Sequence, residues 1–174
     1  GSAGGNGSGD KVTVDWTGSI VTEGTNASGI YAQSAGGKEI KTQYTYTKDG
    51  VPVAINLTLR QNLGKDVLVD VKGSVVTKGD DSAAIYAQST GDQGSGNVTV
   101  RLASGGSVVG GNASGVGIQI FGGANNLIEN HGSVSALSGS AILADIGNER
   151  VDNYGTITGN VERGTGSNAF NNLN

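Results

Sequence analysis

Apolar and polar residues alternate with a period of two along most of the chain. Val12, Val14 and Trp16 occupy every second position, and polar residues stand between them. This is the pattern of a half-buried strand, because successive side chains of a strand point to opposite faces. Short segments of this kind recur between Gly and Asn residues, and no apolar period of 3.6 residues extends over a useful length. The pattern predicts an all-β protein.

A longer pattern also repeats. The segment Gly18-Ser-Ile-Val-Thr-Glu-Gly, followed by Ile30-Tyr-Ala-Gln-Ser, returns in close copy from Gly73 and Ile85. Degraded copies begin at Gly106, Gly132 and Gly155. A short repeat cannot bury its apolar face alone, so consecutive repeats stack on one another. We therefore expect a solenoid of parallel coils, each with about three short strands joined by Gly or Asn turns.

Counting from each repeat glycine assigns the residues that point into the solenoid. The expected columns are Val14/Val69/Leu102/Ile128/Val151, Trp16/Val71/Ser104/Asn130/Asn153, Ile20/Val75/Val108/Val134/Ile157, Ile30/Ile85/Ile118/Ile142 and Ala32/Ala87/Ile120/Ala144. In the second column Asn130 and Asn153 are expected to form a buried amide ladder. The same alignment predicts that Tyr31 lies directly over Tyr86 on the outside of adjacent coils.

The interval from Gly18 to Gly73 is about twice the later intervals, which indicates an insertion over residues 36–64. Two alternating segments flank Asp49-Gly50, a dipeptide typical of a two-residue β-hairpin turn. We expect one solenoid domain over residues 1–174 with a protruding hairpin. The hairpin supplies the candidate binding residues, which are Lys41, Tyr44, Tyr46, Lys48 and Arg60. It either contacts a protein or anionic glycan, or merely covers the side of the solenoid.

Composition narrows the possible functions. The chain has 174 residues with 32 Gly, a net charge of −4 and no Cys. An acidic balance gives no general attraction to nucleic acid, and the absence of Cys excludes disulfides and thiolate metal sites. Nothing resembles a signal peptide or a membrane-spanning segment. The Gly-Ser start and the uncapped end suggest a piece of a longer protein.

The outward positions of the first strand offer the clearest candidate chemistry. The expected row is Asp15, Asp70, Ala103, Glu129 and Asp152, flanked by Lys72, Arg101, His131, Arg150 and Tyr154. Carboxylates one coil apart, as Glu129 and Asp152 are expected to be, would suit the acid and nucleophile of a retaining glycosidase. The alternative is a solvated face whose charges alternate in sign. Residues 4–10 nearly match a calcium-binding nonapeptide, but the Asp is displaced by one place, so neither a metal nor a cofactor is expected.

The repeat resembles a known family. Residues 7–34 contain, in order, the segments Gly-Ser-Gly-Asp, Val-Thr-Val, Gly-Ser-Ile-Val-Thr and Ile-Tyr-Ala-Gln-Ser, and residues 73–100 contain part of this series. The series is similar to the repeats of large bacterial autotransporter passenger domains. Asn130-His-Gly-Ser-Val and Asn153-Tyr-Gly-Thr-Ile are similar to the Asn-x-Gly-x-Ile coils of that family.

The resemblance implies a right-handed parallel β-helix of five to six coils, exported through the outer membrane and displayed on the bacterial surface. It also implies a non-catalytic role in adhesion, aggregation or virulence. The implied partners are a host-cell or extracellular-matrix protein or glycan, or another copy on a neighbouring cell. The alternative function is a polysaccharide-acting enzyme that uses the Glu129 and Asp152 face.

Overall fold

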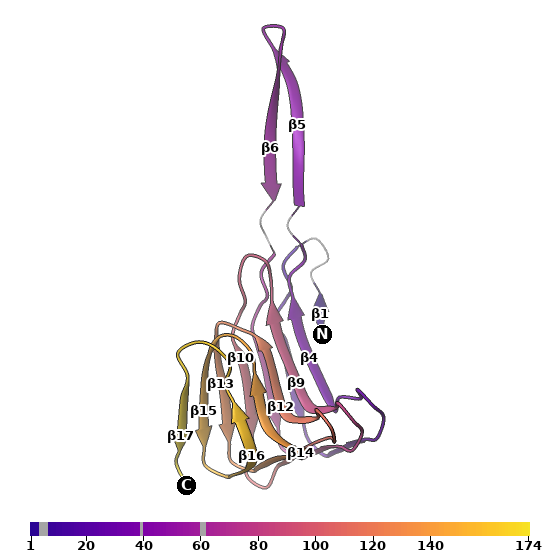
Figure 1. The fold of residues 1–174 in the computed structure, drawn as a ribbon, viewed down its shortest axis with the longest axis vertical. Coiled ribbons are helices and arrows are strands. Elements are labelled where there is room, and N and C mark those ends of the chain that lie inside the picture. The colour runs from indigo at the N-terminus through magenta and orange to yellow at the C-terminus, as the bar shows by residue number, and fades with distance from the viewer. Residues whose placement is uncertain (4–6, 39, 60–61) are drawn as a thin grey trace.

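The computed structural model describes residues 1–3, 7–38, 40–59 and 62–174. All regular elements in this part of the chain are β-strands, wound into stacked coils from which one hairpin projects (Figure 1). The coil strands pair in parallel, as expected when each coil repeats the path of the one before. The predicted all-β parallel β-helix is therefore confirmed.

One side of the solenoid is a six-stranded parallel sheet that takes one strand from each coil. Its strands in chain order are β2 (Val12–Trp16), β7 (Val67–Val71), β10 (Val98–Leu102), β13 (Asn125–Asn130), β15 (Asn148–Asn153) and β17 (Ala169–Asn172). We call this the first sheet. Its six strands agree with the expected five to six coils.

The other sides form one continuous nine-stranded sheet. In the first three coils it takes two strands per coil, namely β3 (Ser19–Thr22) and β4 (Ile30–Ala35), β8 (Ser74–Thr77) and β9 (Ala83–Thr90), and β11 (Ser107–Gly110) and β12 (Val116–Gly122). In the fourth coil the long β14 (Ser133–Ala144) pairs with both β11 and β12, and β16 (Thr156–Glu162) pairs with β14. The short β1 (Ser2–Ala3) pairs with the end of β4.

The core consists of columns of aliphatic residues that run through the stack. Ile30 pairs with Ile85, Ile85 with Ile118, and Ile118 with Ile142, and all four side chains are buried. The columns that begin at Ile20, Ile30 and Ala32 match the predicted ones. Stacking like residues buries a continuous apolar strip that no single coil could bury alone.

The predicted alignment of the third coil is wrong by two residues. Val100, not Leu102, pairs with Val69 and Ile128, and Leu102 takes the place predicted for Ser104. The cause lies in the turn between β10 and β11, which has two more residues than the turn between β7 and β8. Gly105 permits the longer turn because its φ of 79° lies in the left-handed region.

The repeat glycines form a column of their own, in which adjacent coils touch through their backbones. A Cβ on Gly73 would lie 2.0 Å from the carbonyl oxygen of Gly18, and one on Gly155 would lie 2.1 Å from that of Gly132. The same close approach lets the next residue form an inter-coil hydrogen bond, such as Ser74 N to Gly18 O at 2.7 Å. Glycine recurs at this position because a side chain would push the coils apart.

The hairpin consists of β5 (Ile40–Lys48) and β6 (Val51–Leu59), paired with each other in antiparallel register. Asp49 and Gly50 form the two-residue turn with φ values of 52° and 78°. Positive φ at both positions is typical of a type I′ turn, whose twist matches that of the strands. Figure 1 shows the hairpin standing out beyond the end of β4, and neither strand makes an extensive contact with a coil strand. The predicted insertion is confirmed.

Candidate functional site

Charged side chains line the outer face of the first sheet. The strand register aligns Asp15, Asp70, Arg101, Glu129 and Asp152 in one outward row. Arg101 occupies the place predicted for Ala103, because the longer turn of the third coil shifts the register by two residues. The row therefore contains a cation between its second and third carboxylates, Asp70 and Glu129, which relieves the repulsion between stacked negative charges.

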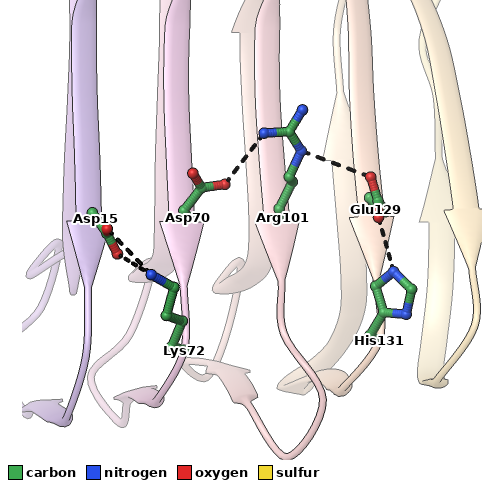
Figure 2. Close-up of polar contacts among 6 residues, drawn as sticks. All are labelled: Asp15, Asp70, Lys72, Arg101, Glu129 and His131. Atoms are coloured by element: carbon green, nitrogen blue, oxygen red, sulfur yellow. Dashed lines mark hydrogen bonds and ion pairs between the residues drawn. The ribbon is translucent and has the colours of Figure 1, made fainter.

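The contacts along this row neutralise most of its charge (Figure 2). Arg101 lies between two carboxylates, with Nη1 3.7 Å from Asp70 Oδ1 and Nε 3.7 Å from Glu129 Oε2. Lys72 Nζ donates to Asp15 Oδ1 at 3.1 Å, and His131 Nε2 lies 2.8 Å from Glu129 Oε1. Exposed pairs of this kind contribute little stability individually, so their main effect is to keep the face close to neutral.

Glu129 and Asp152 are direct register partners on adjacent coils, as predicted. Asp152, however, accepts a hydrogen bond from Arg150 Nε at 2.9 Å and another from Asn171 Nδ2 at 2.7 Å. These contacts lower the pKa of Asp152, so this carboxyl group remains ionised at neutral pH. In a retaining pair Asp152 could therefore serve only as the nucleophile, and Glu129 would have to be the acid.

The surface around Glu129 does not bring the two carboxylates into one cleft. Glu129 lines a shallow groove of about 220 Å³ together with Arg101 and His131, and Asp152 is not among its lining residues. A polysaccharide chain placed in this groove would meet two carboxylates, Asp70 and Glu129, with the guanidinium of Arg101 between them. The second oxygen of Glu129 also faces the imidazole of His131. The geometry suits a structural charge ladder, and cleavage of polysaccharide stays a prediction.

The hairpin has one apolar and one polar face. Tyr44 pairs with Ile55, Tyr46 pairs with Val53, and Thr42 pairs with Leu57. Because opposite residues of an antiparallel pair point to the same side, these side chains share one face, which we call the hairpin apolar face. Its large side chains are well exposed, with Tyr44 61%, Leu57 49% and Ile55 42% accessible.

The predicted binding residues of the hairpin divide between its two faces. Tyr44, Tyr46 and Lys48 alternate on β5 and lie on the apolar face, where the two rings are 6.5 Å apart between centroids. Lys41 lies on the opposite face, together with Gln43, whose Nε2 donates to Asn56 Oδ1 at 3.1 Å. Arg60 lies outside the described residues. The tyrosines therefore lie on an aliphatic and aromatic face with Lys48 near its tip, and the role of these residues in binding stays a prediction.

The predicted amide ladder is confirmed inside the solenoid. Asn130 Nδ2 donates to Asn153 Oδ1 at 2.7 Å, and Asn153 Nδ2 donates to Asn172 Oδ1 at 2.7 Å. Asn130 and Asn153 are buried. Next to this ladder, on the outer face, the rings of His131 and Tyr154 stack with centroids 4.5 Å apart. These residues therefore have structural partners, and neither the ladder nor the ring pair forms a nucleophile–base arrangement.

A buried carboxyl group in the fifth coil was not predicted. Glu149 is 2% exposed and accepts a hydrogen bond from Asn126 Nδ2 at 2.7 Å. Burial raises the pKa of Glu149, against the effect of the Asn126 hydrogen bond, and nearby Asp145 raises it further. The sequence alone could have predicted this burial, because Glu149 stands two and four residues before the inward residues Val151 and Asn153 and so points to the same side of the strand.

The predicted stacking of Tyr31 on Tyr86 is confirmed. Their centroids lie 4.9 Å apart with 3° between the ring planes. The pair lies on the outer face of β4 and β9, far along each coil from the charged row of the first sheet. The tyrosine pair borders a groove whose other wall is made by turn residues. The alignment of strand positions could not predict this groove, because it does not describe the turns.

Within the described residues no group of three or more His, Asp or Glu side chains could hold a metal ion, and no helix is long and apolar enough to cross a membrane. The calcium-like segment over residues 4–10 lies partly outside the described residues. Comparison of the chain with protein-family models, with curated proteins and with solved structures found no match.

Proposed function

We propose that this chain is a non-catalytic interaction segment of a surface-displayed bacterial passenger protein, and that the hairpin is its contact element for a protein partner. The observation that carries the proposal is the exposed hairpin apolar face on an otherwise regular solenoid. An isolated two-stranded hairpin is marginally stable in water. A second surface that covers its apolar face would stabilise the hairpin.

The chemistry of this face favours a protein over an anionic glycan. Tyrosine and aliphatic side chains together resemble the core of a protein–protein interface, where aromatic residues are enriched and charges are depleted. The lysine that accompanies the tyrosines, Lys48, pairs with Val51 beside the turn, at the rim of the face. The solenoid acts as a rigid stalk that holds the face away from the body, as the repeat resemblance to passenger domains implies for an adhesin.

The test is attachment of beads coated with the chain to wells coated with fibronectin, laminin or collagen, and to cultured epithelial monolayers. The key variant combines Tyr44→Ser, Ile55→Ser and Leu57→Ser, which removes three large exposed side chains of the apolar face and keeps the turn. A matched control combines Thr45→Ser and Thr58→Ser on the polar face. We expect at least tenfold less attachment for the first variant and unchanged attachment for the control.

Two outcomes would contradict the proposal. One is wild-type beads that attach to none of these surfaces, and the other is attachment that survives removal of the apolar face. Sedimentation of the soluble chain separates a third case. A concentration-dependent dimer that the same triple variant abolishes would make the hairpin a contact between copies, and the host-protein partner would be wrong.

A further inference from the structure

A second surface, independent of the hairpin, crosses the first three coils. It is an open groove of about 620 Å³ on the outer face of β4, β9 and β12, a volume within the range of small-ligand sites. Its strand wall is the row Tyr31, Tyr86 and Gln119, which the register places one above the other. We call this surface the tyrosine groove. It shares no residue with the hairpin.

The opposite wall of the groove is built by the turns that precede these strands. Asn26 and Asp81 occupy equivalent places in successive coils and have φ values of 55° and 56°. This left-handed conformation, which Asn and Asp tolerate better than most residues, turns the chain back beside the strand that follows. In the third coil Ser114 lines the same wall, and its N–H donates to Asp81 Oδ1 at 3.1 Å.

The aromatic part of the groove offers an accessible π surface. Tyr31 is 54% exposed, and one face of its ring is stacked on Tyr86, so a ligand ring would have to use the opposite face. Burial raises the pKa of Tyr86, so its phenol remains protonated and can donate a hydrogen bond. A pyranose ring has a face of C–H groups, which suits the electron-rich face of an aromatic ring, and a rim of hydroxyls, which needs donors and acceptors.

The polar part of the groove supplies donors and acceptors without a positive charge. Asn26 and Gln119 carry amides, which donate and accept, Ser114 carries a hydroxyl, and Asp81 carries a carboxylate that only accepts. No Lys, Arg or His lines the groove. An anionic ligand would face Asp81 without a cation to offset the repulsion, so the groove selects against sulfated or sialylated glycans.

From these observations we propose that the tyrosine groove binds a neutral oligosaccharide, with a sugar ring on Tyr31 and its hydroxyls bonded to the turn wall. The three strands that line the groove span about 10 Å at the spacing of a parallel sheet, enough for a short oligosaccharide that lies along the solenoid axis. The groove is open and preformed, so binding requires no rearrangement of the coils. This site does not rest on the hairpin proposal.

The test follows backbone NMR shifts of the full chain during titration with maltotriose, cellotriose, lactose and diacetylchitobiose, each to about 10 mM, because weak open sites bind in the millimolar range. A heparin tetrasaccharide and sialyllactose are the anionic probes. We expect at least one neutral sugar to shift residues of the groove, and the anionic probes to shift them less. Tyr31→Ala should weaken binding at least tenfold, whereas Tyr31→Phe should largely preserve it.

Two further variants keep the result interpretable. Tyr154→Ala removes an exposed stacked tyrosine on the other sheet and should leave sugar binding unchanged. Gln119→Ala removes a hydrogen-bonding group and should weaken binding even if Tyr31→Ala fails to fold. The proposal is overturned if no neutral sugar perturbs the groove, if an anionic probe binds more tightly, or if both groove variants bind as the wild type does. The hairpin triple variant should retain sugar binding, which separates failure here from failure of the hairpin proposal.

Discussion

Replacing Gly132 by alanine tests whether backbone contact between coils explains the repeat glycines. An added Cβ would lie 2.2 Å from the carbonyl oxygen of Gly106 and 3.0 Å from that of Ala103. Ordinary van der Waals contacts of a Cβ begin at 3.4 Å, so the two coils must separate locally by about an ångström. That movement strains the hydrogen bond from Ser133 N to Gly106 O, which is 3.0 Å long.

The expected cost combines overpacking with a weakened inter-coil hydrogen bond. Overpacking in a close-packed interior costs about 1–3 kcal/mol, and leaving a buried backbone group without its partner costs about 1–3 kcal/mol more. We expect Gly132→Ala to lower the free energy of unfolding by about 3 kcal/mol. For a chain of this length the melting temperature would fall by about 6–12 °C.

The assay is thermal and urea unfolding followed by circular dichroism, with Gly24→Ala as the matched control. Gly24 also lies in a turn of the solenoid, but a Cβ there would meet nothing closer than Ala27 Cβ at 3.5 Å. The control should change stability by no more than about 0.5 kcal/mol. Equal melting of the two variants would refute the argument, because it would mean that the coils separate without measurable cost.

Three further predictions concern the interior and the insertion. The raised pKa of Glu149 means that its protonated form stabilises the fold, and that this contribution is lost as pH rises through that pKa. Glu149→Gln should therefore have a higher melting temperature than the wild type at pH 7, and the difference should close as the pH is lowered towards about 4. A difference in melting temperature that does not change with pH would contradict the raised pKa. Asn130→Ala should lower the free energy of unfolding by about 2 kcal/mol in urea titrations, because it removes the bonds from Asn130 Nδ2 to Asn153 Oδ1 and Thr156 O and the acceptor of Gly132 N. Asn160→Ala, at an exposed position, should have almost no effect. Replacing residues 40–59 with a short Gly/Ser link should preserve a cooperative melting transition, because the pairing of β4 with β9 does not use the hairpin. Loss of the transition would show that the hairpin is part of the folding unit.

The columns of the solenoid could be predicted wherever the turn that ends at the repeat glycine kept its length. Ile20 and Ile30 begin columns that the structure reproduces, because their partners in the second and third coils stand at the same distance after the repeat glycine. The prediction failed in the third coil because the alignment counted back from Gly106 across a turn that has two more residues than the corresponding turn of the second coil. The alternation of Val98, Val100 and Leu102 would have given the correct register, since strand phase is independent of turn length.

The candidate sites were predictable to different extents. The hairpin followed from Asp49-Gly50, and its two faces follow from alternation and the turn alone. The Tyr31 and Tyr86 pair followed from the close copy of one repeat. The turn wall of the tyrosine groove could not be predicted from the repeat, because the left-handed conformations of Asn26 and Asp81 decide where their side chains lie. Sequence periodicity describes strands, and it gives little information about such turns.

The division between inward and outward positions supports our proposal that partners bind the hairpin apolar face and the tyrosine groove. Inward residues and repeat glycines are constrained by the coils above and below, so a change there acts on stability. Outward residues are free to differ. In the charged row of the first sheet, however, side chains of adjacent coils form ion pairs with one another, as Arg101 does with Asp70 and Glu129. The hairpin apolar face and the tyrosine groove have large exposed side chains that the stacking of the coils does not require. On both surfaces we therefore expect that a partner gains contacts without disturbing the solenoid.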